Sequence, residues 1–157
     1  MGKIADNWTS EGRRFMKELR ELAELEVRIG YQRGQAASDD DNSRADLVDI
    51  AMWNELGTVN IPSRPFMRDS VDKHIPAINH MLAAQKDALL EGATAEKILN
   101  TVGLFQQDLI QTEIEKGDFV ANAPSTIKKK GSDKPLIDTG TMKNSVHYYI
   151  AKKGSMD

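Results

Sequence analysis

The chain has no cysteine among its 157 residues, so disulfides, thiolate nucleophiles and cysteine-based zinc or iron–sulfur sites are excluded. It also lacks any run of about 18 consecutive apolar residues, the length that a membrane-spanning helix needs. No apolar stretch follows the few charges near the N-terminus, and we therefore expect no signal peptide. These absences are compatible with a protein made in a reducing cytoplasm.

A strong excess of charge is absent as well. The formal net charge is −3, and acidic and basic residues are interspersed, whereas a dedicated nucleic-acid-binding domain is usually basic or has a basic face. Hydrophobic residues make up 39% and charged residues 29%, and the mean hydropathy is −0.51. The core is therefore lean, and we expect part of the chain to be extended or to become buried only against a partner.

The common catalytic patterns are missing. There is no G-x-S-x-G, Walker A or dinucleotide fingerprint, and His74, His80 and His147 do not form the H-E-x-x-H pattern of zinc proteases. The acidic run 39–41 does not match an EF-hand loop, which needs a later glycine and glutamate, so it indicates a solvated loop. We expect no enzyme, no cofactor and no catalytic or metal-binding residue.

The spacing of apolar residues predicts helices at 8–24, 44–56, 66–91 and from 94 to 116. Pro76 lies inside the third of these, so the segment either breaks near residues 74–76 or has Pro76 in the first turn of its longer part. Alternating apolar and polar residues predict strands at 25–32 and 146–151, which can pair with each other.

Capping residues give the expected helix starts. Thr9 or Ser10 would cap the first helix, Thr94 the last long one, and a short turn at 140–144 would be capped by Asp138 or Thr139. For the helix at 44–56, the expected caps are Asn42 or Ser43, with Asp46 in the first turn.

These elements predict an α+β fold in which a helical hairpin and further helices pack on a small antiparallel β-sheet. The length is that of one ordinary domain, so we expect a single domain over residues 1–157. The polar stretches at 33–43 and 118–137 are expected to be mobile loops.

The most constrained stretch is an elbow between two predicted helices, Asn54–His74. Gly57 should end the first helix in the left-handed conformation, because it has no Cβ. Pro62 and Pro65 fix their own φ and push the residues before them toward extended geometry. The elbow therefore sets the angle between its two helices, and no catalytic chemistry is visible in it.

The elbow contains the runs N-E-L-G-T and I-P-S-R-P-F-M-R, and a second stretch at Lys128–Val146 reads K-K-K-G-S-D-K-P-L-I-D-T-G-T-M-K-N-S-V. Together they resemble the two-part signature of the tail-completion, or neck, proteins of long-tailed bacteriophages, also described as tail components. The resemblance covers residues 45 to 150. Leu56 stands where the family often has Phe, and Met142 where it often has Leu, both conservative apolar changes.

The resemblance implies a structural virion morphogenesis protein at the phage head–tail junction, assembled in the host bacterial cytoplasm, and no reaction. The implied partners are other copies of the chain in a ring, hexameric by family analogy, and tail-tube, tail-terminator or head-connector proteins. The family-motif residues are Gly57, Pro62, Arg64, Pro65, Phe66, Pro135, Leu136, Asp138, Thr139, Gly140 and Ser145. Among them, Arg64 can bridge to a carboxylate or to helix-end carbonyls, and Phe66 can anchor the elbow in the core.

A basic loop leaves a second function open. Lys128, Lys129, Lys130 and Lys134 can contact an acidic protein surface or nucleic-acid phosphate, including DNA in a channel. The alternative function is therefore a nucleic-acid-binding module that uses this loop, although a solvated loop is the simpler interpretation for an acidic chain. In a ring, the two long polar loops would be the contact arms.

Overall fold

The structure is a computed structural model that describes residues 7–35, 45–117, 119 and 140–156. In chain order the elements are α1 (Ser10–Glu24), β1 (Leu25–Gly30), α2 (Leu47–Leu56), α3 (Phe66–Asp72), α4 (Ile75–Glu91), α5 (Ala95–Lys116), α7 (Thr141–Asn144) and β2 (His147–Lys152). The predicted α+β class is confirmed, with a helical hairpin and further helices on a small antiparallel sheet. None of the helices in the described part of the chain is long and apolar enough to cross a membrane.

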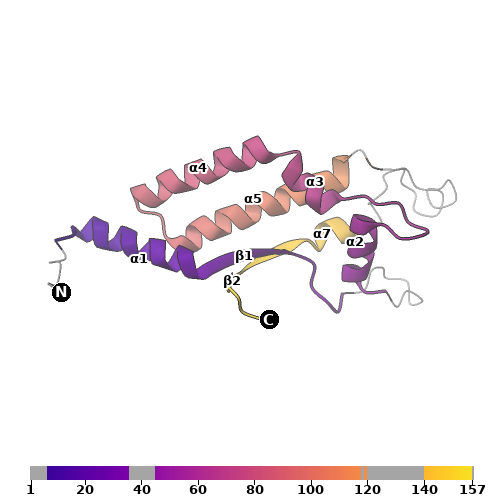
Figure 1. The fold of residues 1–157 in the computed structure, drawn as a ribbon, viewed down its shortest axis with the longest axis horizontal. Coiled ribbons are helices and arrows are strands. Elements are labelled where there is room, and N and C mark those ends of the chain that lie inside the picture. Colours follow the sequence, from indigo (N-terminus) through magenta and orange to yellow (C-terminus); the bar gives the residue numbers. More distant parts are fainter. Residues whose placement is uncertain (1–6, 36–44, 118, 120–139, 157) are drawn as a thin grey trace.

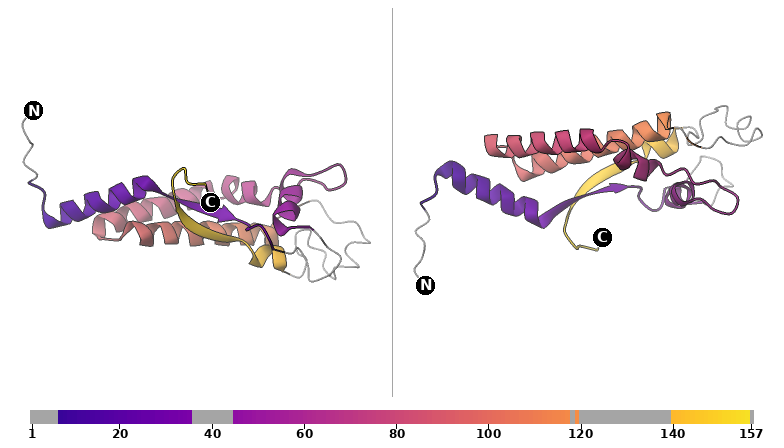
Figure 2. Two further views of the ribbon diagram at one scale, coloured as in Figure 1. Left: turned by 90° about the horizontal axis from the view of Figure 1, so that it is seen from below. Right: turned by 45° about the horizontal axis from the view of Figure 1, so that its top comes forward.

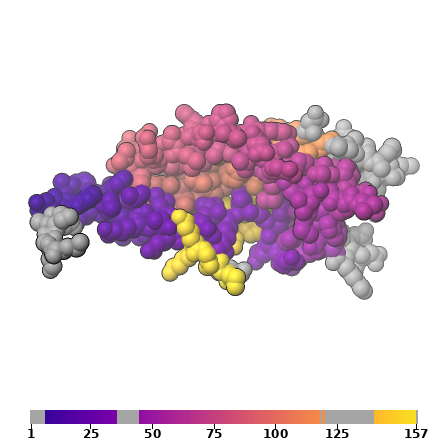
Figure 3. Space-filling view, viewed as in Figure 1, coloured from indigo at the N-terminus to yellow at the C-terminus, as the bar shows by residue number. Residues whose placement is uncertain are grey.

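The molecule is elongated, and α5 is its central element (Figure 1). α5 contacts both strands as well as α1, α3, α4 and α7. β1 and β2 pair in antiparallel register from Leu25 opposite Lys152 to Gly30 opposite His147. In every ribbon view α1 lies at one end of the long axis and α2 at the other (Figures 1 and 2), and α1 projects from the body in the space-filling view (Figure 3).

A close contact seats α5 on the sheet. The ring of Tyr148 in β2 lies against Gly103, where an added Cβ would come within 2.2 Å of the ring. The Tyr148 hydroxyl donates a hydrogen bond to the Asn100 side chain at 2.9 Å. Only glycine leaves room for this contact, so Gly103 allows α5 to approach the two-stranded sheet closely.

The predicted break at Pro76 is present. α3 ends at Asp72 and α4 begins at Ile75, which places Pro76 in the first turn of α4, where its missing N–H removes no helical hydrogen bond. Gly92 ends α4 in the left-handed conformation, and Thr94 caps α5 by accepting from the Lys97 amide at 3.2 Å. The short turn between α4 and α5 makes the expected helical hairpin.

The start of α2 differs from the prediction. The helix begins at Leu47, and Asp46 is its N-cap, because its carboxylate accepts from the amides of Val48 at 3.0 Å and Gly34 at 2.7 Å. The cap expected at 42 or 43 was wrong, and those residues lie outside the described part. The strands shift slightly, since β1 ends at Gly30 and β2 runs from His147 to Lys152. α1 begins at Ser10 with Thr9 as its cap.

The expected mobile loops fall mostly outside the described residues. Of 33–43, only 33–35 are described, and the amide of Leu47 donates to the Gln35 carbonyl at 2.8 Å. Of 118–137, only Phe119 is described, and it packs against the core.

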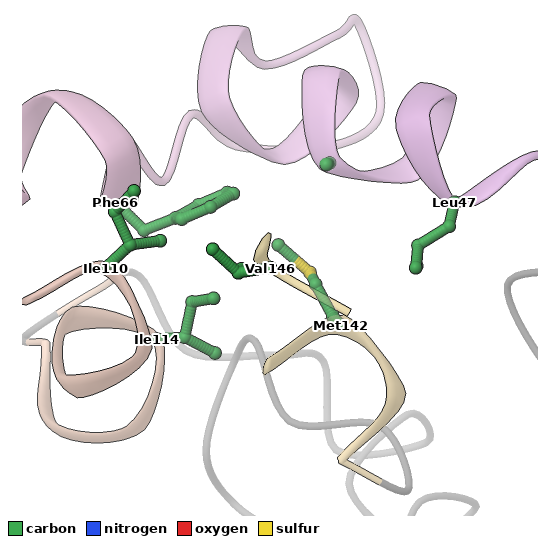
Figure 4. Packing of buried hydrophobic residues seen from close by; sticks show 7 residues of the cluster. Leu47, Phe66, Ile110, Ile114, Met142 and Val146 are labelled. Carbon is green, nitrogen blue, oxygen red and sulfur yellow. The ribbon is translucent and has the colours of Figure 1, made fainter. Parts of the chain in front are cut away.

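A hydrophobic cluster lies at the end of the molecule that contains α2 and α7, and further buried apolar residues lie along α4 and α5. Its members come from separate parts of the chain: Leu47, Ala51, Phe66, Ile110, Ile114, Met142 and Val146. Figure 4 shows these side chains pointing toward one another from α2, α3, α5 and the α7–β2 segment. The cluster therefore joins the two motif regions of the sequence.

Candidate functional site

The elbow begins at a glycine that no other residue can replace without strain. Gly57 has φ 79° and ψ 162°, and its amide donates to the Trp53 carbonyl at 2.8 Å. The positive φ was expected, but ψ places the residue in a region populated almost only by glycine, away from the left-handed helix. A Cβ here would lie 2.9 Å from the Ser63 amide nitrogen and 3.2 Å from the Ile61 carbonyl oxygen. The chain therefore turns back on itself at Gly57 with no room for a side chain.

The loop after Gly57 is closed by its own hydrogen bonds. The Thr58 amide donates to the Ile61 carbonyl at 2.7 Å, and the Thr58 hydroxyl accepts from the Ile61 amide at 3.0 Å. The Ser63 hydroxyl donates to the Glu55 carbonyl at 2.9 Å, which ties the loop to the last turn of α2. Pro62 is exposed within this loop. These bonds hold the elbow in one shape.

A carboxylate from α2 caps the helix that follows the elbow. Pro65 occupies the N-cap position of α3, and it offers no side-chain acceptor. Glu55 accepts instead, from the amides of Met67 at 2.9 Å and Arg68 at 3.1 Å. A negative charge at a helix N-terminus also interacts favourably with the helix dipole. Sequence reasoning missed Glu55, because a cap supplied from the preceding helix has no local spacing signal.

Arg64 is buried beside the end of α2. One guanidinium nitrogen donates to the Asn54 side-chain oxygen at 3.0 Å, and the Arg64 backbone amide donates to the Asn54 carbonyl. Asn54 in turn donates to the Ile50 carbonyl at 2.9 Å. Burial lowers the pKa of Arg64. The helix-end carbonyl expected as a partner is therefore bound by the backbone of Arg64, while its guanidinium binds the Asn54 amide group.

Phe66 anchors the elbow in the core. It is completely buried, and its ring meets the ring of Tyr31 edge to face, with 6.4 Å between centroids. The Tyr31 hydroxyl is buried and has no hydrogen-bond partner among the described residues. Burial, with the nearby Glu55 carboxylate, raises the pKa of Tyr31. The aromatic pair fixes the start of α3 against the chain that leaves β1.

The described part of the second motif reaches the same core. Gly140 has φ 78° and ψ −1°, in the left-handed region, and is itself the N-cap position of α7 with no side-chain cap bond. Ser145 ends α7, donating from its amide to the Thr141 carbonyl at 3.0 Å. Met142 and Val146, on either side of this turn, are buried in the cluster with Phe66. The two motif regions, distant in sequence, thus form one packed unit (Figure 4).

Several predicted site residues lie outside the described part of the chain. They are the remaining motif residues Pro135, Leu136, Asp138 and Thr139, and the basic residues Lys128, Lys129, Lys130 and Lys134. The proposed caps of the 140–144 turn are among them. Of the described motif residues, Phe66 is a member of the core cluster, and Gly140 and Ser145 flank the segment that supplies Met142 and Val146 to it.

At the last residues of the elbow, a buried carboxylate of α5 faces the end of α3. Glu113 lies 3.6 Å from the Lys73 ammonium and 3.5 Å from Nε2 of His74. Lys73 also pairs with Asp69 at 3.0 Å, and this bond, followed by the Glu113 charge, raises the pKa of Lys73. In the part of the chain that is described, no group of three or more histidine and carboxylate side chains could hold a metal ion. The pairs tie α3 to α5.

Comparison of the chain with protein-family models, with curated proteins and with solved structures finds no match.

Proposed function

We propose that the chain is a structural virion protein at the head–tail junction of a long-tailed phage, where it acts as a ring of its own copies. One observation carries the proposal beyond the motif resemblance. The described parts of both motif regions pack in a single core, through Phe66 on one side and Met142 and Val146 on the other. Two sequence stretches that meet in this way belong to one structural unit, which supports treating them as one signature.

The construction of the elbow supports a structural role. Its polar side chains bind helix ends and neighbouring backbone groups, as Glu55 does at Met67 and Ser63 does at Glu55. A site that holds geometry in this way is suited to presenting surfaces to neighbouring subunits at a fixed angle. We assign it no reaction.

The proposal is tested by removing the gene from the phage that encodes it and viewing the particles by electron microscopy. We expect heads and tails that fail to join, or tails with abnormal ends, and rescue when the chain is supplied in trans. Normal infectious particles without the gene would overturn the proposal. Salt-sensitive DNA binding by the purified chain, lost when Lys128, Lys129, Lys130 and Lys134 are changed to alanine, would favour the nucleic-acid-binding alternative.

The elbow itself is tested in the same rescue experiment with Pro65→Ala. Loss of the fixed φ at the start of α3 should reduce rescue, because the angle between α2 and α3 is no longer set. The matched control is Pro76→Ala in the first turn of α4, outside the elbow, which should rescue fully. Equal rescue by both variants would show that the elbow geometry is not needed for assembly.

A further inference from the structure

The apolar side of α1 is only partly covered by the described residues. Phe15, Leu19 and Leu22 follow one another at helical spacing, with Trp8 just before the helix. Phe15 and Leu22 are half-buried, whereas Leu19 and Trp8 are 40% and 50% exposed. The buried residue of α1 is Glu18, whose carboxylate accepts from the Ala95 amide at 2.8 Å. A helix with so clear an apolar side normally packs that side against another surface.

At the opposite end, α2 is apolar on both of its sides. Leu47 and Ala51 point into the core, whereas Met52 and Leu56 on the outer side are 47% and 67% exposed. Trp53 and the fully exposed Val59 extend the same outer surface. We call Met52, Trp53, Leu56 and Val59 the α2 patch. A group of exposed large apolar side chains is typical of a contact surface, and the described residues leave the α2 patch largely open.

The two uncovered surfaces complement each other in charge. Arg13 and Arg20 lie one turn before and one turn after Met16, at the edge of the apolar side of α1. Asp49 lies one turn before Met52 and Trp53, whereas the other carboxylate of α2, Glu55, is bound to the start of α3. Opposite charges beside two apolar surfaces favour the approach of those surfaces and help to set their register.

The positions of the surfaces exclude their meeting within one molecule. α1 and α2 lie at opposite ends of the long axis in each ribbon view (Figures 1 and 2). We propose that the apolar side of α1 in one copy of the chain packs on the α2 patch of the next copy. This contact joins different surfaces, so its repetition builds a ring or an open filament. The inference rests on the self-assembly proposed above and names the surfaces that carry it.

The absence of native cysteine allows a direct test by disulfide cross-linking. Leu19→Cys and Leu56→Cys are made separately, because both side chains are exposed and neither supports the core. The two purified proteins are mixed in equal amounts and oxidised, and a disulfide forms only when the two Cβ atoms come within about 4.5 Å. We expect a linked dimer in the mixture that contains one chain of each kind.

Controls separate this contact from other associations. Leu104→Cys on α5 is similarly exposed and lies on neither surface. Its mixture with Leu56→Cys should therefore give no linked dimer. A dimer formed by Leu19→Cys alone, or by Leu56→Cys alone, would mean that like surfaces pair and would overturn the proposal. Dimers formed equally with Leu104→Cys would overturn it as well.

A second measurement separates this contact from the proposed function. Leu56→Glu should shift the average mass in sedimentation toward the single chain of 17.5 kDa, whereas Leu104→Glu should leave it unchanged. If the chain forms rings that neither Leu56→Glu nor cysteine pairing affects, this contact is wrong and the head–tail role stands. If the contact is found but particles lacking the gene are normal, the head–tail role is wrong and the contact stands.

Discussion

At the end of the molecule that contains α2 and α7, four parts of the chain bury apolar side chains against one another, whereas at the other end α1 buries a carboxylate. Phe66 sits at the centre of the first arrangement and Glu18 at the centre of the second. The first end is held by apolar burial and by the bonded elbow. The second end has buried apolar residues in the α4–α5 hairpin, Leu89, Ala95, Ile98 and Leu99. α1 itself is attached to this hairpin by the Glu18 cap and by partial packing on α4 and α5.

The two kinds of contact differ in strength. Burying a large apolar side chain contributes about 1.5–3 kcal/mol relative to leaving it exposed. A helix cap contributes about 0.5–2 kcal/mol. We therefore expect α1 to open before the elements that form the cluster. α1 would then gain its remaining stability from another copy.

The largest expected effect is that of Phe66→Ala. Truncating a completely buried phenylalanine removes transfer free energy and leaves a cavity, which should lower the free energy of unfolding by about 3–5 kcal/mol. Leu19→Ala at the α1 end should lower it by about 0.5 kcal/mol or less, because the side chain is exposed. Urea unfolding followed by circular dichroism measures both. Similar losses of unfolding free energy in Phe66→Ala and Leu19→Ala would mean that α1 is packed as firmly as the cluster.

Gly57→Ala tests the elbow and should have the next largest effect. Alanine rarely adopts the positive φ of this position, so the strained backbone should lower the free energy of unfolding by about 1–3 kcal/mol. The added Cβ would also lie too close to the Ser63 amide nitrogen. The matched control is Gly34→Ala, which has a similar φ of 89° but nothing within 4 Å of the added Cβ. The same unfolding experiment should show a larger loss for Gly57. Equal losses of unfolding free energy would indicate that the positive φ alone causes the effect and that the elbow shifts to make room for the added Cβ.

Glu18→Ala tests the α1 end and should cost about 0.5–2 kcal/mol, the usual range for a lost cap. The amide of Ala95 would lose its acceptor in a buried position, so its hydrogen exchange should become faster. Glu21→Ala on the same helix is a control, because Glu21 forms only an exposed pair with Lys17 at 3.8 Å among the described contacts. Unchanged exchange at Ala95 in Glu18→Ala would contradict the capping role.

Local features of the fold followed from the sequence. Thr9, Thr94 and the break at Pro76 were predicted correctly, because caps and proline act within one turn of the chain. The Asp46 cap carried a local signal as well, since aspartate is a strong cap. It was misplaced because polar residues of similar capping preference precede it at 42 and 43.

The features that were missed depend on contacts between distant segments. Glu55 caps α3 from α2, and Glu18 caps α5 from α1, so neither carboxylate lies near its helix in sequence. The meeting of the two motif regions around Phe66 is also tertiary. The resemblance marked Phe66 as a motif residue, but only packing shows that it touches the same cluster as Met142 and Val146.

The smallest expected effect is the pH dependence of the Asp46 cap at the α2 end. Hydrogen bonds from the amides of Gly34 and Val48, with the charge of Arg33, lower the pKa of Asp46 below its ordinary value of 3.8. A lowered folded-state pKa gives stability that is present above pH 3.8 and lost as the pH falls through the folded value. The difference in unfolding midpoint between the wild-type chain and Asp46→Asn should therefore shrink as the pH is lowered below 3.8. Thr94→Ala removes the uncharged cap of α5, whose first residue is bound by Glu18 of α1, so its effect should not change with pH; a shared pH dependence would mean that the charge of Asp46 does not act in the cap.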